Sequence, residues 1–251
     1  MVNTSGFGFK LVSLEIEGFR NFQNKFVLDL RSPSGDPINY FVLSGPNGSG
    51  KTTVLEAISL VFGGGGSSDL NSNSRLSAEV ESISSKSIFR FDRKIETYDR
   101  INFSVEYLSE QSANLYKKIR KLDPLFGHEW LGRLNTYWRD FRDDGTHFVI
   151  DHCDEREWDL FINKGDKRLY SVASMSSGEQ AVIGLAIPLL QTKFEGLLLI
   201  DYPEQYLHPR WVGRIVRALR NLAPNAQIIV ATNSDDAWED AKSWERILLN
   251  N

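Results

Sequence analysis

The segment Gly45 to Thr52, GPNGSGKT, constrains this chain more than any other because it fits the phosphate-binding pattern G-x-x-x-x-G-K-[ST]. Glycines let the backbone wrap an anion, so that consecutive N–H groups point at phosphate oxygens. The lysine of such a loop reaches the β- and γ-phosphates, and the hydroxyl residue after it ligates Mg²⁺. The residues predicted to bind the nucleotide are Gly45, Pro46, Asn47, Gly48, Ser49, Gly50, Lys51, Thr52 and Thr53.

The flanking sequence supports a phosphate-binding loop rather than a glycine-rich turn that matches by chance. Residues 40–43, YFVL, are typical of a short buried strand. The apolar residues after the loop follow helical spacing, so we expect a helix from Gly50 that aims its positive end at the phosphates. Lys51 is therefore a predicted catalytic residue as well as an ATP ligand, and Thr52 is a predicted Mg²⁺ ligand.

A second metal ligand is predicted at the end of another strand. Residues 197–201, LLLID, form an apolar run that ends in a carboxylate, which is typical of a buried parallel strand. Ligands bind at the carboxyl ends of such strands. Asp201 is therefore predicted to hold Mg²⁺, directly or through water.

The chain has 251 residues, and 41% of them are hydrophobic. This is enough to form the core of one large α/β domain or of two small ones. We see neither a secretory signal nor an apolar run of transmembrane length, and Cys153 is the one cysteine. These features lead us to expect a cytoplasmic location and no membrane partner. The net charge of −4 means that contact with nucleic acid would need a local basic patch.

Two other parts of the chain have periodic patterns. Alternating apolar residues in 12–16 and 26–30 predict two strands that pair as an antiparallel flap beside a mainly parallel sheet. Residues 128–142 place six apolar side chains, four of them aromatic, on one face of a predicted helix, and we interpret this face as core rather than as a docking surface. We find no heptads, and therefore expect no coiled-coil arm.

Four segments in a fixed order connect the chain to a known family: LEIEGFRNF at 14–22, MSSGEQ at 175–180, DYPEQYLHP at 201–209 and ATNS at 231–234. Together with the phosphate-binding loop, they resemble the ABC-type ATPases of the SMC/RecF/OLD branch, in particular the compact ATPases of bacterial anti-phage systems. The resemblance implies an α/β P-loop NTPase fold in which residues 1–251 form one ABC-type head. A helical lobe at roughly 108–190 would carry the signature motif.

The resemblance also implies roles for individual residues. Ser177 and Gly178 would contact the γ-phosphate of ATP bound to a partner subunit, so that a homodimer sandwiches two ATP molecules. Arg20 would occupy the family's basic position near the nucleotide. Gln111 is a candidate for the family's Q-loop glutamine by position alone.

Two departures from the family pattern concern hydrolysis. The family has Glu directly after the Walker B Asp, where this chain has Tyr202, and it has a switch His where this chain has Asn233. Glu204 is retained and is the predicted catalytic carboxylate, while Asn233 is predicted to hydrogen-bond the γ-phosphate. Tyrosine is a poor base at neutral pH, so we expect slow turnover.

Three functions remain open on this basis. The first is an ATP-gated scaffold for a separate effector such as a nuclease or toxin, the second is an actively cycling ATPase that acts on DNA, and the third, which the motifs disfavour, is the ATPase subunit of a transporter. Arg210, Arg214, Arg217 and Arg220 form one stripe on a predicted helix. This stripe could be a solvated face or a contact for nucleic-acid phosphates.

Overall fold

The computed structural model describes residues 9–62, 74–83, 85–92, 105–108, 127–152, 158–190, 194–205 and 207–250. The chain divides into two compact units. Unit 1 consists of Met1–Ser109, Glu195–Pro203 and Asn225–Asn251, and unit 2 consists of Glu110–Phe194 and Glu204–Pro224. Among the described helices, none is long and apolar enough to cross a membrane. The candidate residues Gln111 and Cys153 lie outside the described ranges.

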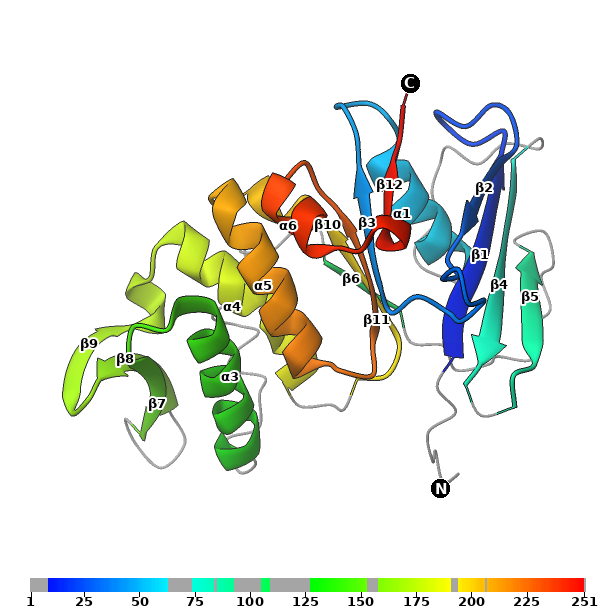
Figure 1. Cartoon of the computed structure of the whole chain (residues 1–251). Helices are drawn as coiled ribbons and strands as arrows, with labels where there is room; N and C mark the ends of the chain where they lie inside the picture. Colours follow the sequence, from blue (N-terminus) through cyan, green and yellow to red (C-terminus); the bar gives the residue numbers. More distant parts are fainter. Residues whose placement is uncertain are drawn as a thin grey trace. The chain divides into compact units, whose positions relative to one another are not determined.

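Unit 1 contains two sheets and the helix that follows the phosphate-binding loop (Figure 1). Its elements are β1 (Phe9–Glu17), β2 (Phe26–Asp29), β3 (Tyr40–Ser44), α1 (Lys51–Val61), β4 (Arg75–Ser82), β5 (Ile88–Asp92), β6 (Val105–Leu108), β10 (Leu197–Asp201), β11 (Gln227–Ala231), α6 (Asp235–Asp240), η4 (Ser243–Glu245) and β12 (Arg246–Leu248).

The five-stranded sheet of unit 1 has the order β12-β3-β11-β10-β6, and every neighbouring pair in it is parallel. Residues Leu43, Ala231 and Asp201 are in register across β3, β11 and β10, so these three strands end at one edge. The four-stranded sheet has the order β2-β1-β4-β5 and is antiparallel throughout. The edge of the parallel sheet is the place where segments far apart in sequence can share a ligand.

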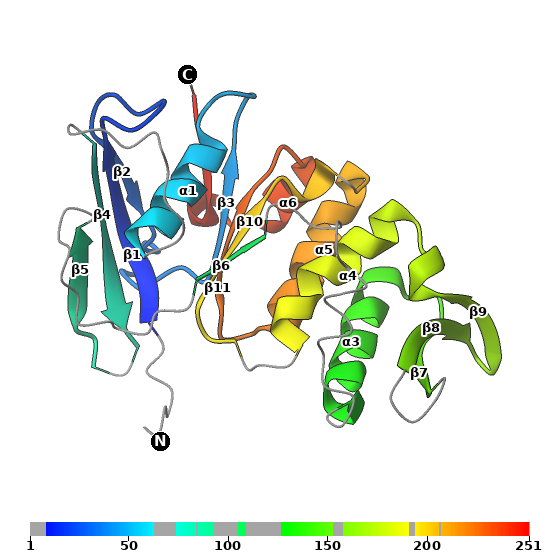
Figure 2. The same cartoon turned by 180° about the vertical axis from the view of Figure 1, so that it is seen from behind.

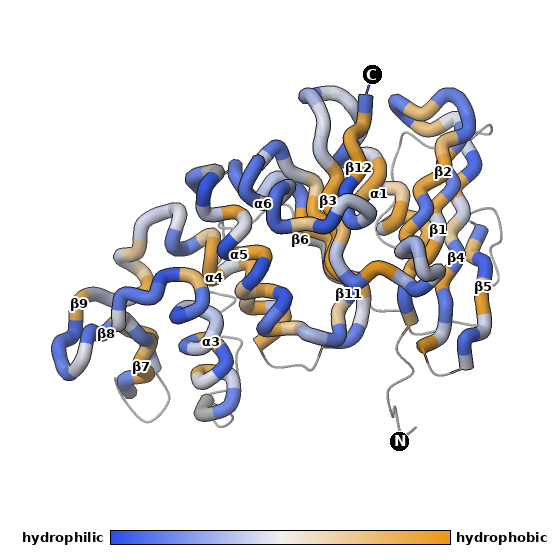
Figure 3. Tube along the Cα trace, viewed as in Figure 1, coloured by the Kyte–Doolittle hydropathy of each residue, from blue (hydrophilic) through white to orange (hydrophobic). Residues whose placement is uncertain are grey.

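Apolar burial explains why α1 lies where it does. The helix contacts β1 and β4 of one sheet and β10 and β11 of the other, and Figure 2 shows it between the two sheets. Val54, Leu55 and Ile58 are fully buried in the core that these elements share. In Figure 3, β3 is coloured mainly as hydrophobic, and hydrophobic and hydrophilic residues alternate along β1. The core therefore fixes the first turn of α1 next to the loop that precedes it.

Among its described residues, unit 2 contains three α-helices and a small antiparallel sheet of order β7-β8-β9. Its elements are α3 (Gly127–Arg142), β7 (Thr146–His152), β8 (Trp158–Lys164), β9 (Lys167–Ser171), η2 (Val172–Ser174), α4 (Ser177–Leu190) and α5 (Pro209–Leu222), with η3 (Pro203–Gln205) at the border between the ranges of the two units.

The aromatic face predicted for residues 128–142 is core, as expected. Five of its six apolar residues are buried on α3, namely Trp130, Leu134, Tyr137, Trp138 and Phe141. Leu131 is half-buried. The Tyr137 hydroxyl donates a hydrogen bond of 2.8 Å to the Val182 carbonyl of α4, so this tyrosine is also satisfied within unit 2. Because the aromatic side chains of α3 are buried and the Tyr137 hydroxyl is hydrogen-bonded, this face is not available for docking.

Candidate nucleotide-binding site

The phosphate-binding loop has the backbone that its glycines allow. Gly45, Gly48 and Gly50 have φ values of 143°, 84° and 98°, in the region that favours glycine. A Cβ atom on Gly45 would lie 2.3 Å from the Leu249 carbonyl oxygen, and one on Gly50 would lie 2.9 Å from the Phe22 ring. The space next to Gly48 is open. Both close packing and backbone conformation therefore require glycine at positions 45 and 50.

Lys51 lies inside the loop that precedes it. Its side chain is buried, and Nζ donates hydrogen bonds of 2.6 Å to the Gly45 carbonyl and 3.1 Å to the Pro46 carbonyl. The same ammonium group lies 5.1 Å from the centre of the Tyr202 ring. Among the residues that the structure describes, the hydrogen-bond acceptors of this ammonium are neutral carbonyls, and such a buried cation is well suited to an anionic ligand.

The two predicted metal ligands lie together. Thr52, in the first turn of α1, donates a hydrogen bond of 3.2 Å from Oγ1 to Asp201 Oδ1 at the end of β10. Asp201 is buried with 9% of its surface exposed. A hydroxyl and a carboxylate at this separation are the oxygen ligands that Mg²⁺ takes beside a nucleotide.

The two residues that depart from the family pattern meet on the loop. Asn47 Oδ1 accepts a hydrogen bond of 3.2 Å from the Tyr202 hydroxyl and another of 3.1 Å from Asn233 Nδ2. Tyr202 follows β10 with a left-handed φ of 45°, and its backbone N–H donates a 2.9 Å hydrogen bond to the Ala231 carbonyl. Left-handed backbone at a bulky residue is costly and is held only by specific surroundings.

The segment that contains Arg20 contacts the loop through its neighbour. Arg20 itself forms an ion pair with Glu56 of α1. Asn21 donates a 2.5 Å hydrogen bond from Nδ2 to the Gly48 carbonyl. The family resemblance assigns a role to Arg20 and none to Asn21, although Asn21 lies in the same matched segment, 14–22, which is the signal that points to it.

The signature segment lies in unit 2 and begins a well-capped helix. Ser176 and Glu179 form a capping box at the start of α4: Ser176 N–H donates to the Glu179 carboxylate (3.0 Å), and Glu179 N–H donates to Ser176 Oγ (3.3 Å). Arg142 and the Tyr170 hydroxyl also donate to this carboxylate. Burial alone would raise the pKa of Glu179, but these hydrogen bonds outweigh it and hold the pKa below its usual value. Ser177 and Gly178 are thereby fixed at the beginning of the helix.

The predicted site residues therefore fall into two groups. The structure brings Asn47, Lys51, Thr52, Asp201 and Asn233 together within unit 1. The other group, Ser177, Gly178 and Glu204, belongs to unit 2, and the action of these residues on a nucleotide stays a prediction.

The residues of unit 1 fit a nucleotide with its Mg²⁺. The glycine-lined loop is open at Gly48, the Lys51 ammonium has carbonyls as its hydrogen-bond acceptors, and Thr52 with Asp201 supplies hard oxygen ligands. The buried Ser49 Oγ also has no hydrogen-bond partner among the described residues. The chemistry of the donor set is thus that of a phosphate cradle with an adjoining cation site.

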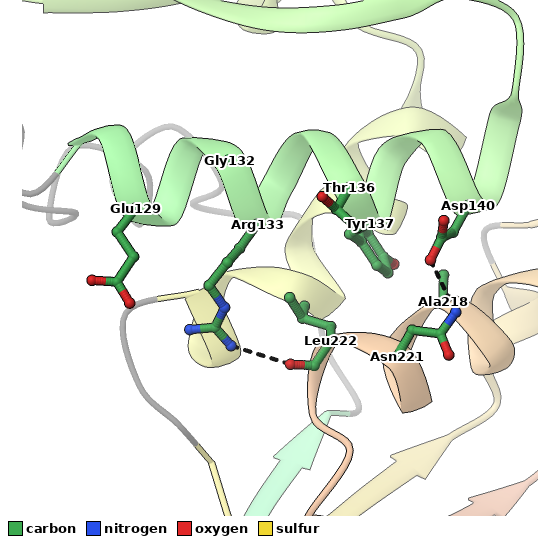
Figure 4. Close-up of a pocket in the computed structure, with 9 residues that line it drawn as sticks. All are labelled: Glu129, Gly132, Arg133, Thr136, Tyr137, Asp140, Ala218, Asn221 and Leu222. Atoms are coloured by element: carbon green, nitrogen blue, oxygen red, sulfur yellow. Dashed lines mark hydrogen bonds between the residues drawn. The ribbon is translucent and has the colours of Figure 1, made fainter.

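Unit 2 contains a second concave site, between α3 and α5 (Figure 4). The cavity measures about 260 Å³. Arg133 extends along it and donates hydrogen bonds to the Leu190 carbonyl (2.7 Å) and the Leu222 carbonyl (3.2 Å), while Asn221 donates 2.9 Å to Asp140. Because these groups cap the ends of α4 and α5 and join α3 to α5, we interpret the cavity as structural.

Fold and site together define a P-loop ATPase. A family model described as an AAA domain matches residues 13–186, and a second AAA-domain model matches residues 152–236. The chain belongs to the AAA domain family. Such a domain binds a nucleotide.

Two proteins named PtuA match this chain over most of its length. The chain is 23% identical to the Septu protein PtuA of Bacillus thuringiensis over 83% of this chain and 69% of that protein. It is 26% identical to PtuA of Bacillus mycoides over 88% of this chain but only 38% of that protein, so it spans well under half of the second relative. Together with the AAA-domain models and the SMC-head structure described below, these matches confirm the resemblance to SMC/RecF-like ABC-type ATPases and to those of anti-phage systems.

Solved structures support the fold. The structure of an SMC head bound to the C-terminal winged-helix domain of ScpA matches with a TM-score of 0.60 at 14% identity, over 92% of each chain. At 14% sequence identity, this similarity is evidence for the fold alone. The prediction of an α/β P-loop ATPase of the SMC-head type is confirmed.

Proposed function

We propose that this protein is an ATP-binding ABC-type ATPase that forms an ATP-sandwich dimer and scaffolds or gates a separate effector, with slow hydrolysis. The observation that carries the proposal is the joint placement of a buried Lys51 and the Thr52–Asp201 pair at one edge of the parallel sheet. Lys51 binds phosphate, and Thr52 and Asp201 hold Mg²⁺, which supplies charge neutralisation at the phosphates.

Dimerisation rests on the signature segment. A capped α4 presents Ser177 and Gly178 in its first turn, where backbone N–H groups and the helix dipole favour an anion. In the proposal these residues contact the nucleotide of a second copy. Each site then needs groups from both chains, so nucleotide binding and dimer formation are coupled.

Slow hydrolysis follows from the residues at the ends of β10 and β11. The Tyr202 hydroxyl donates to Asn47, so the group in the family's glutamate position is a hydrogen-bond donor to the loop and not a carboxylate beside water. Loss of a positioned base typically costs about 10²–10⁴-fold in rate. Glu204 remains the proposed source of residual activity. An enzyme of this kind spends most of its time bound to ATP.

An effector partner is proposed from the relatives. The PtuA proteins that the chain matches are longer than the region they share with it. Their resemblance to this chain favours a role in anti-phage defence, in which an ATP-bound dimer holds a nuclease or toxin that this chain does not itself encode in any recognisable motif.

A second candidate function is an ATPase that acts on nucleic acid, and one observation favours it. On α5, Arg210, Arg214 and Arg217 are exposed, and the exposed Trp211 packs edge-to-face on Phe141 at 5.6 Å. The opposite face, with Val212, Ile215, Val216 and Leu219, is fully buried. Arginines beside a fixed aromatic ring suit phosphates and bases.

The test of the dimer is light scattering with and without ATP and Mg²⁺. We expect ATP to convert monomers to dimers, and we expect Ser177→Arg to abolish this conversion while ATP binding persists, because the new side chain fills the space of the opposing phosphate. Ser243→Arg makes the same substitution at an exposed serine of unit 1 and should dimerise normally. A Ser177→Arg protein that dimerises like the wild type would eliminate the signature role.

A further inference from the structure

Three adjacent strands end close together, and polar side chains from the segments that follow two of them donate hydrogen bonds to one oxygen atom in the segment that follows the third. β3 leads into the loop that contains Asn47, β11 is followed by Asn233, and β10 is followed by Tyr202. Both Tyr202 and Asn233 donate hydrogen bonds to Asn47 Oδ1, at 3.2 and 3.1 Å. We call Asn47, Tyr202 and Asn233 the loop clamp.

The chemistry of the loop clamp orients the Asn47 amide. A carbonyl oxygen has two lone pairs, and both donors use this oxygen. Nδ2 is then the remaining polar group of the side chain, and it is a donor. A loop residue whose acceptor oxygen is occupied and whose other polar group is a donor favours an anion over a cation.

The Tyr202 ring has a second contact in the same place. The Lys51 ammonium lies 5.1 Å from the centre of the ring, within the range of a cation–π interaction. One side chain therefore contacts the two loop residues, Asn47 through its hydroxyl and Lys51 through its ring. The left-handed φ of 45° at Tyr202 is the backbone conformation in which both contacts are made.

We propose that Tyr202 and Asn233 are positioning residues for the nucleotide: through Asn47 they hold the phosphate-binding loop in its binding form before ATP arrives. The inference rests on the proposed function, in which this loop binds ATP. It gives the two departures from the family pattern a shared task in affinity, separate from the loss of a hydrolytic group. Preorganisation of this kind strengthens binding because less order must be imposed when the ligand binds.

The experiment is calorimetric titration with ATP and Mg²⁺. Tyr202→Phe removes the hydroxyl and keeps the ring, and Asn233→Ala removes the second donor. Each should weaken ATP binding about three- to tenfold, the loss expected for one hydrogen bond. Tyr202→Leu also removes the ring from Lys51 and should weaken binding further. Tyr40→Phe is the matched control in unit 1, since it removes a buried hydroxyl that bonds the Ala237 carbonyl, and it should leave the affinity unchanged.

A double-mutant cycle separates positioning from a general structural effect. In an Asn47→Ala background, Tyr202→Phe should cause no further loss of affinity, because the acceptor through which the hydroxyl acts is gone. Melting temperatures of the single variants should lie within about 2 °C of the wild type, as expected for partly exposed groups.

The outcomes distinguish the two proposals. If Lys51→Ala binds ATP much more weakly than the wild type, while Tyr202→Phe binds ATP as the wild type does, the loop clamp is refuted and the proposed function stands. A loss caused by Tyr202→Phe that is equally large in the Asn47→Ala background also refutes the loop clamp. Absence of ATP binding by the wild type overturns both.

Discussion

Gln227 joins the two sheets of unit 1, and its replacement is the sharpest stability prediction that the structure offers. The side chain is 1% exposed. Its Oε1 accepts a hydrogen bond of 2.7 Å from the Leu11 N–H, and its Nε2 donates 2.8 Å bonds to the Leu11 and Ile38 carbonyls. Leu11 lies at the register shift of the β1–β4 pair, where the regular ladder is interrupted.

The magnitude follows from the groups left behind. Gln227→Leu keeps the volume but deprives three buried backbone groups of their partners. Each such group costs about 1–3 kcal/mol, and the lower values apply to carbonyls that retain a second bond. We therefore expect the free energy of unfolding to fall by about 3–5 kcal/mol, which is large for a single substitution.

Urea unfolding, followed by tryptophan fluorescence, measures this change. Gln23→Leu is the control, because Gln23 is an exposed glutamine whose Nε2 donates to the Arg20 carbonyl. It should cost less than about 0.5 kcal/mol. A Gln227→Leu protein that loses less than about 1 kcal/mol would show that these three bonds do not hold the sheets together.

Three further predictions concern charge and hydrolysis. Burial lowers the pKa of Lys10 to about 8, against the attraction of Glu195. The unfolded chain therefore binds more protons than the folded protein between about pH 8 and 10.5, and the free energy of unfolding should rise with pH across this window. Lys10→Met should remove this rise and increase the free energy of unfolding at pH 7 by about 1–2 kcal/mol, after allowance for solvent screening, as urea unfolding would show. Tyr202→Glu should raise kcat for phosphate release at saturating ATP, and Glu204→Gln should remove the residual wild-type activity; brisk wild-type turnover that Glu204→Gln leaves unchanged would contradict both assignments. Arg214→Glu with Arg217→Glu should weaken nucleic-acid binding irrespective of base sequence, as fluorescence anisotropy would show. The slope of the logarithm of the binding constant against the logarithm of the salt concentration should become less steep by about one unit per lost phosphate contact. Binding that is unaffected by both changes would exclude α5 as the nucleic-acid contact.

Local patterns were sufficient to predict the elements that form the site. The glycine spacing of residues 45–52 predicted the loop, and the run 197–201 predicted a buried strand that ends in Asp201; the structure has both. These features depend on neighbours within a few residues, which is why sequence periodicity and composition reveal them.

Long-range contacts could not be predicted in the same way. The Gln227 side chain bonds to Leu11, which is 216 residues away in the chain, and an isolated glutamine has no pattern that indicates this. The family pattern indicates that Tyr202 replaces a glutamate, but it does not predict that the hydroxyl and ring of Tyr202 contact Asn47 and Lys51. That contact depends on a left-handed backbone at Tyr202, which no propensity favours for tyrosine.

Calorimetric titration of the wild type and Lys51→Ala with ATP and Mg²⁺ measures whether the loop binds ATP through Lys51. Loss of a charge-assisted contact worth about 1.5–3 kcal/mol predicts affinity reduced about 10- to 150-fold. Lys167→Ala removes an exposed lysine of unit 2 and should bind ATP as the wild type does. Equal ATP affinity in the wild type and Lys51→Ala would show that Lys51 does not bind the nucleotide.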